Sequence, residues 1–238
     1  MSFVLKKKRS GSYQIFFDAA TPYPELSGAL LPSPEQHLSA GRELPGKGRS
    51  CVTAVVQLNG KCFFLKKYEY RGLFYGLRHF FKASRAFRVF RHQRLAWFAG
   101  VTTPEPLLCI EERNWGWLSD CYILYEYLPE SRLLGECWKD LPEEQRLSVL
   151  RSCGHALKQL HGLGLTHGDS NWRNVMIASP SGPRPRPSLV DFDGSIRPFF
   201  RHNKKFRKDI EHFLRDMRRR ELPDRYIQTF LNAFQGDE

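Results

Sequence analysis

The sequence predicts an α+β fold in which a small β-rich lobe precedes a compact helical lobe. Its 238 residues suffice for one large domain or two small lobes. Strand patterns dominate the first half of the chain and helical patterns the second. With 41% hydrophobic and 13% aromatic residues, the composition excludes a wholly disordered chain. We therefore expect an irregular lead-in at 1–45, an N-terminal lobe at 46–130 and a C-terminal lobe at 131–238.

The expected N-terminal lobe contains a β-hairpin, a helix and a further strand. The lead-in before it is rich in Pro, Gly and Ser, with one strand near Tyr13–Phe17. Apolar and β-branched residues at 51–58 and 61–68 flank the turn signal Asn59-Gly60, which predicts the hairpin. Apolar residues at spacings of three and four predict a helix at 72–98, which the following GVTTPEP ends. The run CYILYEYL at 121–128 predicts the further strand.

The expected C-terminal lobe begins with a long helix. Pro142 and the acids that follow it mark its start, and it continues to Gly162–Gly164. The loop HGDSNWRN comes next, then short strands at 175–178 and 188–192. The chain turns helical again from about Lys204.

The positive charge is concentrated in two segments. The chain has 37 Lys and Arg against 25 Asp and Glu, a net charge of +12. Residues 61–94 carry ten basic residues and one acid, and residues 197–220 carry ten and three. Such excess indicates an anionic lipid, a phosphorylated substrate or nucleic acid as partner, or simply a solvated surface. No nucleic-acid recognition motif accompanies it, which argues against that partner. The basic helix predicted at 72–98 suits an anionic membrane or an acidic lipid-linked glycan; the alternative is an ordinary core-facing helix.

The six cysteines are expected to be reduced, mostly buried thiols. No CxxC pair occurs, and zinc ligation usually needs close pairs. The N-terminal stretch lacks the apolar region of a signal peptide, so we do not expect disulfides. No uncharged apolar stretch reaches the ~18 residues of a membrane span. We therefore expect a cytoplasmic protein with at most peripheral membrane contact.

The strongest chemical signal is THGDSNWRNVMI followed by SLVDFDGS. Asp169 and Asn174 are five residues apart, and Asp191 follows Asn174 by seventeen residues at the end of an apolar strand. In phosphoryl transfer one carboxylate accepts the proton of the attacking hydroxyl, while a second carboxylate and an amide hold Mg²⁺ on the ATP phosphates. We therefore expect Asp169 as catalytic base and Asn174 and Asp191 as Mg²⁺ ligands. The pattern resembles the catalytic hairpin of the protein-kinase-like superfamily; the alternatives are a degenerate pseudokinase or a chance loop.

That superfamily also needs a lysine on its third strand to bind the ATP phosphates. When Phe63-Phe64-Leu65-Lys66 is aligned with the V-A-I-K motif of protein kinases, the lysine is Lys66, with Lys67 as the fallback. Only one can serve, because adjacent strand residues point to opposite faces. The preceding PGKGRS offers Gly46 and Gly48 as a phosphate-binding loop, although it lacks G-x-G-x-x-G and can also be a plain turn.

One expected part of a kinase is missing. The kinase lysine usually pairs with a helical Glu, yet residues 76–100 contain no acid. The residues at the expected place, His92 and Gln93, are polar but not acidic. Glu69 or Glu105 can substitute, or a neutral hydrogen bond can orient the lysine.

The resemblance to protein kinases also suggests roles for several further residues. Glu126 and Leu128 have the place of the inter-lobe hinge, whose backbone binds adenine. His167 is expected to be a structural hydrogen-bonding residue, and Gly168 stands where protein kinases carry the Arg that reads a phosphorylated activation loop. Asp193 stands where D-F-G has Gly and serves either a metal or a local turn.

The tail after the second motif is short. Only 47 residues follow Asp191, and no A-P-E motif occurs. A protein kinase needs a long activation segment and further helices to dock a peptide. The acceptor is therefore expected to be a small molecule or a glycan.

The combined features resemble the lipopolysaccharide core kinase family, which includes heptose and Kdo kinases and InaA-like proteins of Gram-negative bacteria. The matching segments, within residues 45–220, are GKGRS, FFLKKY, SRAFRVFRHQRLAWFAGVTTPEPL, YEYL, HGDSNWRN, LVDFDGS and KKFRKDIEHFLRD. The resemblance implies a bilobal protein-kinase-like fold and ATP-dependent phosphorylation of an inner-core sugar hydroxyl at the cytoplasmic face of the inner membrane.

Two rival functions remain open from the sequence. One is a small Ser/Thr or Tyr kinase or an antibiotic-type phosphotransferase, against which the short tail argues. The other is a pseudokinase that binds a partner or a membrane. The intact Asp169, Asn174 and Asp191 argue against the pseudokinase, and the missing helical Glu argues weakly for it.

Overall fold

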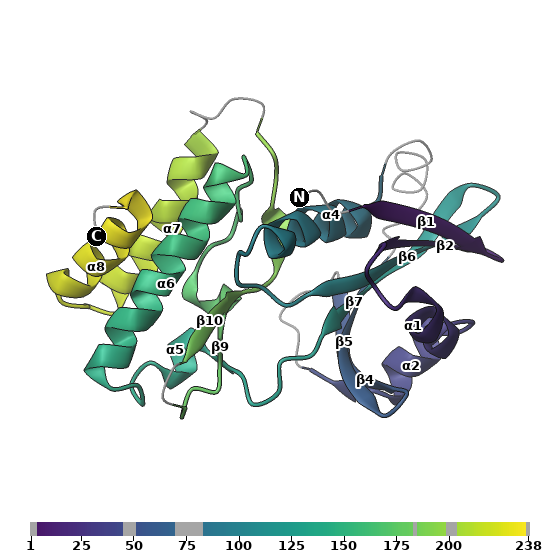
Figure 1. The fold of residues 1–238 in the computed structure, drawn as a ribbon, viewed down its shortest axis with the longest axis horizontal. Coiled ribbons are helices and arrows are strands. Elements are labelled where there is room, and N and C mark those ends of the chain that lie inside the picture. The colour runs from purple at the N-terminus through teal and green to yellow at the C-terminus, as the bar shows by residue number, and fades with distance from the viewer. Residues whose placement is uncertain (1–3, 45–50, 70–82, 183–184, 199–203, 237–238) are drawn as a thin grey trace. The chain divides into compact units, whose positions relative to one another are not determined.

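A computed structural model gives the fold (Figure 1). It describes residues 4–44, 51–69, 83–182, 185–198 and 204–236. Strands and helices are both abundant, so the α+β class predicted from the sequence is confirmed. The chain divides into two compact units, Met1–Arg94 with Glu105–Tyr127 and Leu95–Pro104 with Leu128–Glu238.

The first unit contains a seven-stranded antiparallel sheet among the described residues, in the order β1-β2-β6-β7-β5-β4-β3. Its strands are β1 (Leu5–Ser10), β2 (Tyr13–Asp18), β3 (Arg42–Glu43), β4 (Cys51–Leu58), β5 (Lys61–Tyr68), β6 (Pro106–Asn114) and β7 (Trp117–Glu126).

The hairpin predicted at 51–68 is confirmed as β4–β5. Asn59 and Gly60 both have positive φ, 49° and 78°, which is the backbone of a two-residue turn that matches the twist of the flanking strands. Leu65 in β5 is fully buried, so its truncation to Ala would cost about 2–5 kcal/mol.

Helices lie on both faces of this sheet. The first two are α1 (Tyr23–Leu30) and α2 (Pro34–Ala40), which share one apolar core with the strands. The other face carries α4 (Arg85–Phe98), where Phe87 packs on Phe16 of β2 at 4.2 Å between ring centroids. The core under α1 and α2 includes Ile15, Leu30, Leu38, Val56, Leu65 and Leu124.

The expectation of an irregular lead-in at 1–45 is wrong, although its one expected strand near Tyr13–Phe17 is confirmed as β2. The described residues 4–44 form a full hairpin, two short helices and an edge strand of the sheet. The prolines that suggested irregularity sit in the first turns, as Pro24 of α1 and Pro34 of α2, where a missing N–H costs no hydrogen bond.

The helix predicted at 72–98 is described from Arg85 onward. Ser84 caps it, because its Oγ accepts a hydrogen bond from the Phe87 N–H at 2.9 Å. The helix ends at Phe98, before GVTTPEP, as predicted. The first part of the prediction lies at 70–82, outside the described residues.

The second unit consists of helices around a three-stranded sheet ordered β10-β9-β8. The long helix predicted from Pro142 is confirmed as α6, and α7 begins at Lys204 as predicted. The elements are β8 (Arg132–Leu133), α5 (Leu134–Cys137), α6 (Glu143–Gly162), the 3₁₀ helix η1 (Trp172–Asn174), β9 (Val175–Ala178), β10 (Arg186–Leu189), the 3₁₀ helix η2 (Phe192–Gly194), α7 (Lys204–Arg219) and α8 (Asp224–Gln235).

Close packing joins the helices of the second unit. Phe213 of α7 stacks on Phe230 of α8 at 4.4 Å. Gly154 lets α6 approach α8, because a Cβ there would lie 2.6 Å from the Phe230 carbonyl oxygen. In the described part of the chain, no helix is long and apolar enough to cross a membrane. All six cysteines are free, and four of them are buried.

Candidate active site

The predicted catalytic loop lies in the second unit, between α6 and β9. Its Asp169 side chain is 37% exposed, so a substrate can reach it. The Asn171 amide donates a hydrogen bond to Asp169 Oδ1 at 2.6 Å. Asn174 Nδ2 donates to Asp169 Oδ2 at 3.0 Å and to its backbone oxygen at 2.7 Å, and Arg173 pairs with Oδ2 at 3.2 Å. Donors from three loop residues therefore fix the direction of this carboxylate.

A buried carboxylate on α7 holds the loop from beneath. Asp209, 1% exposed, accepts hydrogen bonds from the backbone N–H groups of His167 and Gly168 at 2.7 and 2.8 Å. His161 Nε2 lies 3.1 Å from the same carboxylate. Ser170 Oγ donates to the Asp209 backbone oxygen at 2.5 Å. Since buried carboxylates need such partners, the loop and Asp209 position each other.

A second acid of α7 holds the other end of the loop. Asp216 accepts a hydrogen bond from the Trp172 N–H at 3.0 Å. Asp209 and Asp216 are seven residues apart and so lie on one face of the helix. Neither role was predicted from the sequence, although two acids seven residues apart in a strongly basic helix were a usable signal.

The glycine that replaces the usual kinase arginine has a steric reason. Gly168 has φ +84°, a conformation that L side chains rarely adopt. A Cβ at this position would lie 2.1 Å from the Gly194 carbonyl oxygen. The loop backbone can therefore run against η2 only with glycine at 168.

The β9–β10 register brings the two predicted metal ligands to one end of this hairpin. Val175 pairs with Leu189, and the Val190 N–H donates to the Asn174 carbonyl at 2.9 Å. Asp191 follows directly and has left-handed backbone, φ 64° and ψ 66°. Aspartate tolerates that conformation better than most residues, and such backbone strain occurs often at functional sites.

The chemistry of this pair fits Mg²⁺. Both hydrogen bonds of the Asn174 side chain to Asp169 come from its nitrogen, so its oxygen can serve as a ligand of a cation. Asp191 is exposed and supplies a carboxylate. The described residues contain no metal-type cluster of three or more His, Cys, Asp or Glu. One amide and one carboxylate nevertheless suit Mg²⁺, which takes its other ligands from substrate phosphates and water.

His167 is a structural residue, as expected. Its ring is fully buried, and Nε2 lies 3.1 Å from the Val190 carbonyl, an acceptor that selects the Nε2–H tautomer. Burial lowers its pKa below the usual value and outweighs the opposite effect of nearby carboxylates, Asp209 first. A neutral ring thus ties the loop to the strand end before Asp191.

The first unit separates the two candidate lysines. Lys66 Nζ lies 5.1 Å from the centroid of the Tyr68 ring, which Arg85 of α4 also contacts, so Lys66 is on the α4 face of the sheet. Lys67 is on the opposite face, paired with Glu35 at 2.7 Å and Asp120 at 3.1 Å. These ion pairs give Lys67 a structural role and support Lys66 as the lysine that binds phosphate.

One of the acids considered as a partner of Lys66, Glu105, pairs with another residue. Arg94 of α4, 1% exposed, pairs with Glu105 and lies 3.7 Å from Asp18. Glu105 is therefore a partner of Arg94. The described part of α4 contains no acid, and Gln93 is buried within it.

The remaining nucleotide-binding predictions fall at the edge of the first unit or beyond the described residues. Glu126 ends β7, and its N–H donates to the Glu105 carbonyl at 2.9 Å. The chain enters the second unit at Leu128. Gly46 and Gly48 lie outside the described residues.

Comparison with known proteins shows the family and the fold. The model of the lipopolysaccharide kinase (Kdo/WaaP) family matches residues 39–234. The solved structure of WaaP in complex with acyl carrier protein is similar, with a TM-score of 0.61 and 15% identity, covering 85% of this chain and 82% of that chain. This likeness confirms the predicted bilobal kinase-like fold.

A curated relative shares a shorter segment. The KEOPS complex subunit Bud32 of Pyrococcus abyssi is 34% identical over 74 residues, which are 31% of this chain and 33% of that protein. The match thus spans about a third of the curated relative. It agrees with the predicted place in the protein-kinase-like superfamily.

Proposed function

Because the chain belongs to the lipopolysaccharide kinase (Kdo/WaaP) family, we propose that it transfers the γ-phosphate of ATP to a sugar hydroxyl of the lipopolysaccharide inner core, on a heptose or Kdo residue. One observation carries the proposal: the reachable Asp169 carboxylate, held by loop donors above the buried Asp209. Phosphoryl transfer depends on positioning, and this arrangement positions a base.

In the proposed reaction Asp169 orients the acceptor hydroxyl and takes its proton. The hydroxyl oxygen forms a bond to the γ-phosphorus as the bond to the β–γ bridging oxygen breaks, and ADP leaves. Asn171 and Asn174 keep the carboxylate turned toward the acceptor through their hydrogen bonds. Arg173, whose side chain is 69% exposed beside this base, can also meet an anionic group of the acceptor.

The proposed Mg²⁺ ligands are Asn174 and Asp191. When bound, Mg²⁺ neutralises phosphate charge and holds the γ-phosphate in line with the acceptor. The hydrogen bond from the Val190 N–H to Asn174 keeps the two ligands at one end of the hairpin.

The proposed nucleotide contacts come from the first unit and the crossing into the second. Lys66 would bind the ATP phosphates from the α4 face of the sheet. Gly46 and Gly48 would approach the phosphates with their backbone, and Glu126 and Leu128 would bind adenine with theirs.

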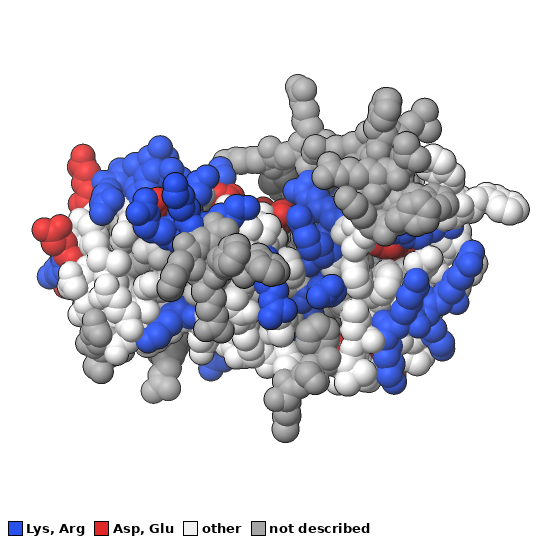
Figure 2. Space-filling model, turned by 90° about the horizontal axis from the view of Figure 1, so that it is seen from above, with Lys and Arg blue, Asp and Glu red and all other residues white. Residues whose placement is uncertain are grey.

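The proposed acceptor is anionic and carried by a membrane. Lys and Arg side chains gather over the C-terminal helices (Figure 2), where α7 exposes Lys204, Lys205, Arg207, Lys208, Arg215, Arg218 and Arg219. Such a surface favours a phosphorylated or acidic glycan at the cytoplasmic face of the inner membrane.

The test is phosphate transfer with purified protein, Mg-ATP and core glycans that end in Kdo or in heptose. We expect product on one of these acceptors and its loss in Asp169→Asn, while ATP binding persists. Phosphorylation of peptides in place of any glycan would assign the protein to the rival protein-kinase class.

A further inference from the structure

Two neighbouring hairpin tips of the first unit combine an exposed indole with a basic strand. We propose that this tip surface docks on an anionic lipid bilayer. The tip surface comprises Trp115 at the β6–β7 turn and the basic strand β1, which carries Lys6, Lys7, Lys8 and Arg9. This docking rests on the proposed function, in which a membrane carries the acceptor.

The β6–β7 turn presents an indole where the fold does not require one. Asn114 pairs with Trp117, so Trp115 and Gly116 form a two-residue turn, and both have positive φ, 53° and 88°. Asn or Gly is preferred at the first of these positions, and a bulky side chain there is strained. Trp115 is nevertheless 96% exposed. Trp117 beside it is 41% exposed, which makes the tip strongly aromatic.

The β1–β2 turn lies beside this aromatic tip. The Arg113 N–H donates to the Ser12 carbonyl at 2.8 Å, and Tyr13 pairs with Glu112. The β1–β2 turn is therefore next to the β6–β7 turn, and the basic strand runs from it along the edge of the sheet with Arg9 nearest to the turn. Both turns emerge at the same end of the sheet in Figure 1.

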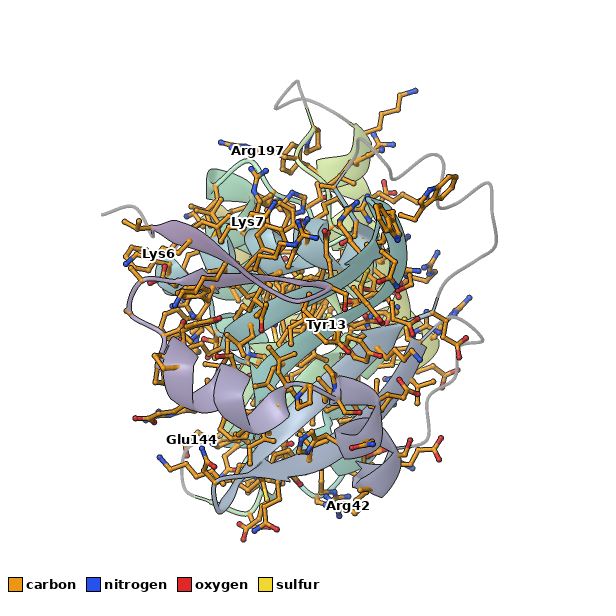
Figure 3. All side chains as sticks on the ribbon, turned by 90° about the vertical axis from the view of Figure 1, so that its right-hand side faces the viewer. Lys6, Lys7, Tyr13, Arg42, Glu144 and Arg197 are labelled. Carbon is orange, nitrogen blue, oxygen red and sulfur yellow. The ribbon has the colours of Figure 1, made fainter. Side chains whose placement is uncertain are left out.

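The basic strand is almost fully solvent-facing. Lys6 to Arg9 are all exposed, and within the described residues none of the four makes an ion pair. Figure 3 labels Lys6 and Lys7 at successive positions of β1, so their side chains leave this edge strand on opposite faces of the sheet. Lys7 lies over the Phe16 ring at 5.5 Å and Lys8 over the Tyr23 ring at 5.1 Å, so their stems rest on the sheet while their charges meet solvent.

The acids near the tip do not neutralise the positive charge of β1. Glu111 is buried and pairs with Arg113 at 2.8 Å. Glu112 lies opposite Tyr13 and is half-buried. The exposed side of β1 itself carries no acid.

An anionic bilayer fits this combination better than a protein. Tryptophan prefers the membrane–water interface, where its ring is apolar and its N–H is wet, and lysine and arginine are drawn to anionic headgroups. A stable protein interface buries about 800 Å² on each partner, which one projecting indole does not provide. Lysines on an edge strand also prevent strand pairing, but that role does not explain Trp115.

The experiment is co-sedimentation of the full chain with phosphatidylcholine vesicles, with and without phosphatidylglycerol, in the absence of ATP and acceptor. Binding is then measured apart from catalysis, so a failed kinase assay and a failed docking test are distinguishable. We expect binding only to the anionic vesicles and weaker binding as salt rises. Quenching of tryptophan fluorescence by brominated lipid reports insertion directly.

The decisive variant is Trp115→Asn. Asn is favoured in this turn, so the fold should be retained or stabilised. We expect roughly tenfold weaker binding, since an aromatic side chain is no longer buried in lipid. Changing Lys6, Lys7, Lys8 and Arg9 together to Gln should also weaken binding by at least about tenfold.

A matched control removes four charges elsewhere. Changing the exposed Lys61, Lys139, Lys158 and Arg186, which lie outside both β1 and α7, to Gln alters net charge by the same amount and should leave most of the binding. Equal loss in both charge variants, or wild-type binding by Trp115→Asn, would overturn the proposal. So would a dimer that Trp115→Asn dissociates, because the tip would then bind a second copy.

Discussion

Replacing the buried Asp209 by Asn tests how the catalytic loop is held. The two side chains have the same shape, but Asn offers one oxygen in place of two. At least one of the His167 and Gly168 N–H groups, now 2.7 and 2.8 Å from the carboxylate, would then face an amide N–H₂. One charge-assisted hydrogen bond, worth about 1.5–3 kcal/mol, is lost and the other becomes neutral. We expect the free energy of unfolding to fall by about 2–4 kcal/mol.

The same substitution should slow phosphate transfer without weakening ATP binding. A shifted loop misplaces the base, and a misplacement of that kind costs on the order of 10²-fold in kcat. Urea unfolding and steady-state kinetics measure the two effects. The control is Glu211→Gln on the same helix, where an exposed pair with Arg207 at 2.9 Å is worth about 0.3–0.5 kcal/mol. An Asp209→Asn protein with control-like stability and kcat would show that Asp209 does not hold the loop.

Three further tests have separable outcomes. Lys66→Ala should raise KM for ATP by at least about tenfold while Lys67→Ala mainly lowers the urea midpoint, and equal kinetic effects would show that the register is wrong. Gly168→Ala should cost about 1–2 kcal/mol from its φ alone, with its clash against Gly194 in addition, and a neutral result in urea unfolding would contradict the close approach. Burial alone would raise the pKa of Glu35, but hydrogen bonds from Lys67 and Tyr122 outweigh burial and lower the pKa below the usual value of about 4.3. Glu35 therefore stabilises the fold at neutral pH, and this stability is lost as the pH falls through the lowered pKa. The difference in urea midpoint between wild type and Glu35→Gln should therefore shrink from neutral pH to about pH 3, and a constant difference would contradict it.

The parts of the fold that were predictable are those with local signals. Asn59-Gly60 specifies its own turn, and Pro142 with the acids after it marks the start of α6. The hairpin expected to carry the catalytic residues was also predictable, because Asp169, Asn174 and Asp191 are close in sequence and the strands β9 and β10 between Asn174 and Asp191 pair directly.

The parts that were missed depend on tertiary context. Strand β1 has polar residues on both faces because it is an edge strand, so it shows no alternation. The apolar pattern of strand β6 is interrupted by Glu111, which is buried because Arg113 in the same strand neutralises it. The role of Asp209 depends on a contact with Gly168, 41 residues earlier in the chain, which no local pattern encodes.

The most direct test of the proposed function is transfer of radiolabelled γ-phosphate from Mg-ATP to isolated inner-core lipopolysaccharide. We expect label on a core sugar hydroxyl, dependence on Mg²⁺, and loss of transfer in Asp169→Asn with ATP binding retained. Unchanged transfer by Asp169→Asn would contradict the role of this carboxylate. No transfer by the wild type to any Kdo- or heptose-bearing core would contradict the proposed function itself.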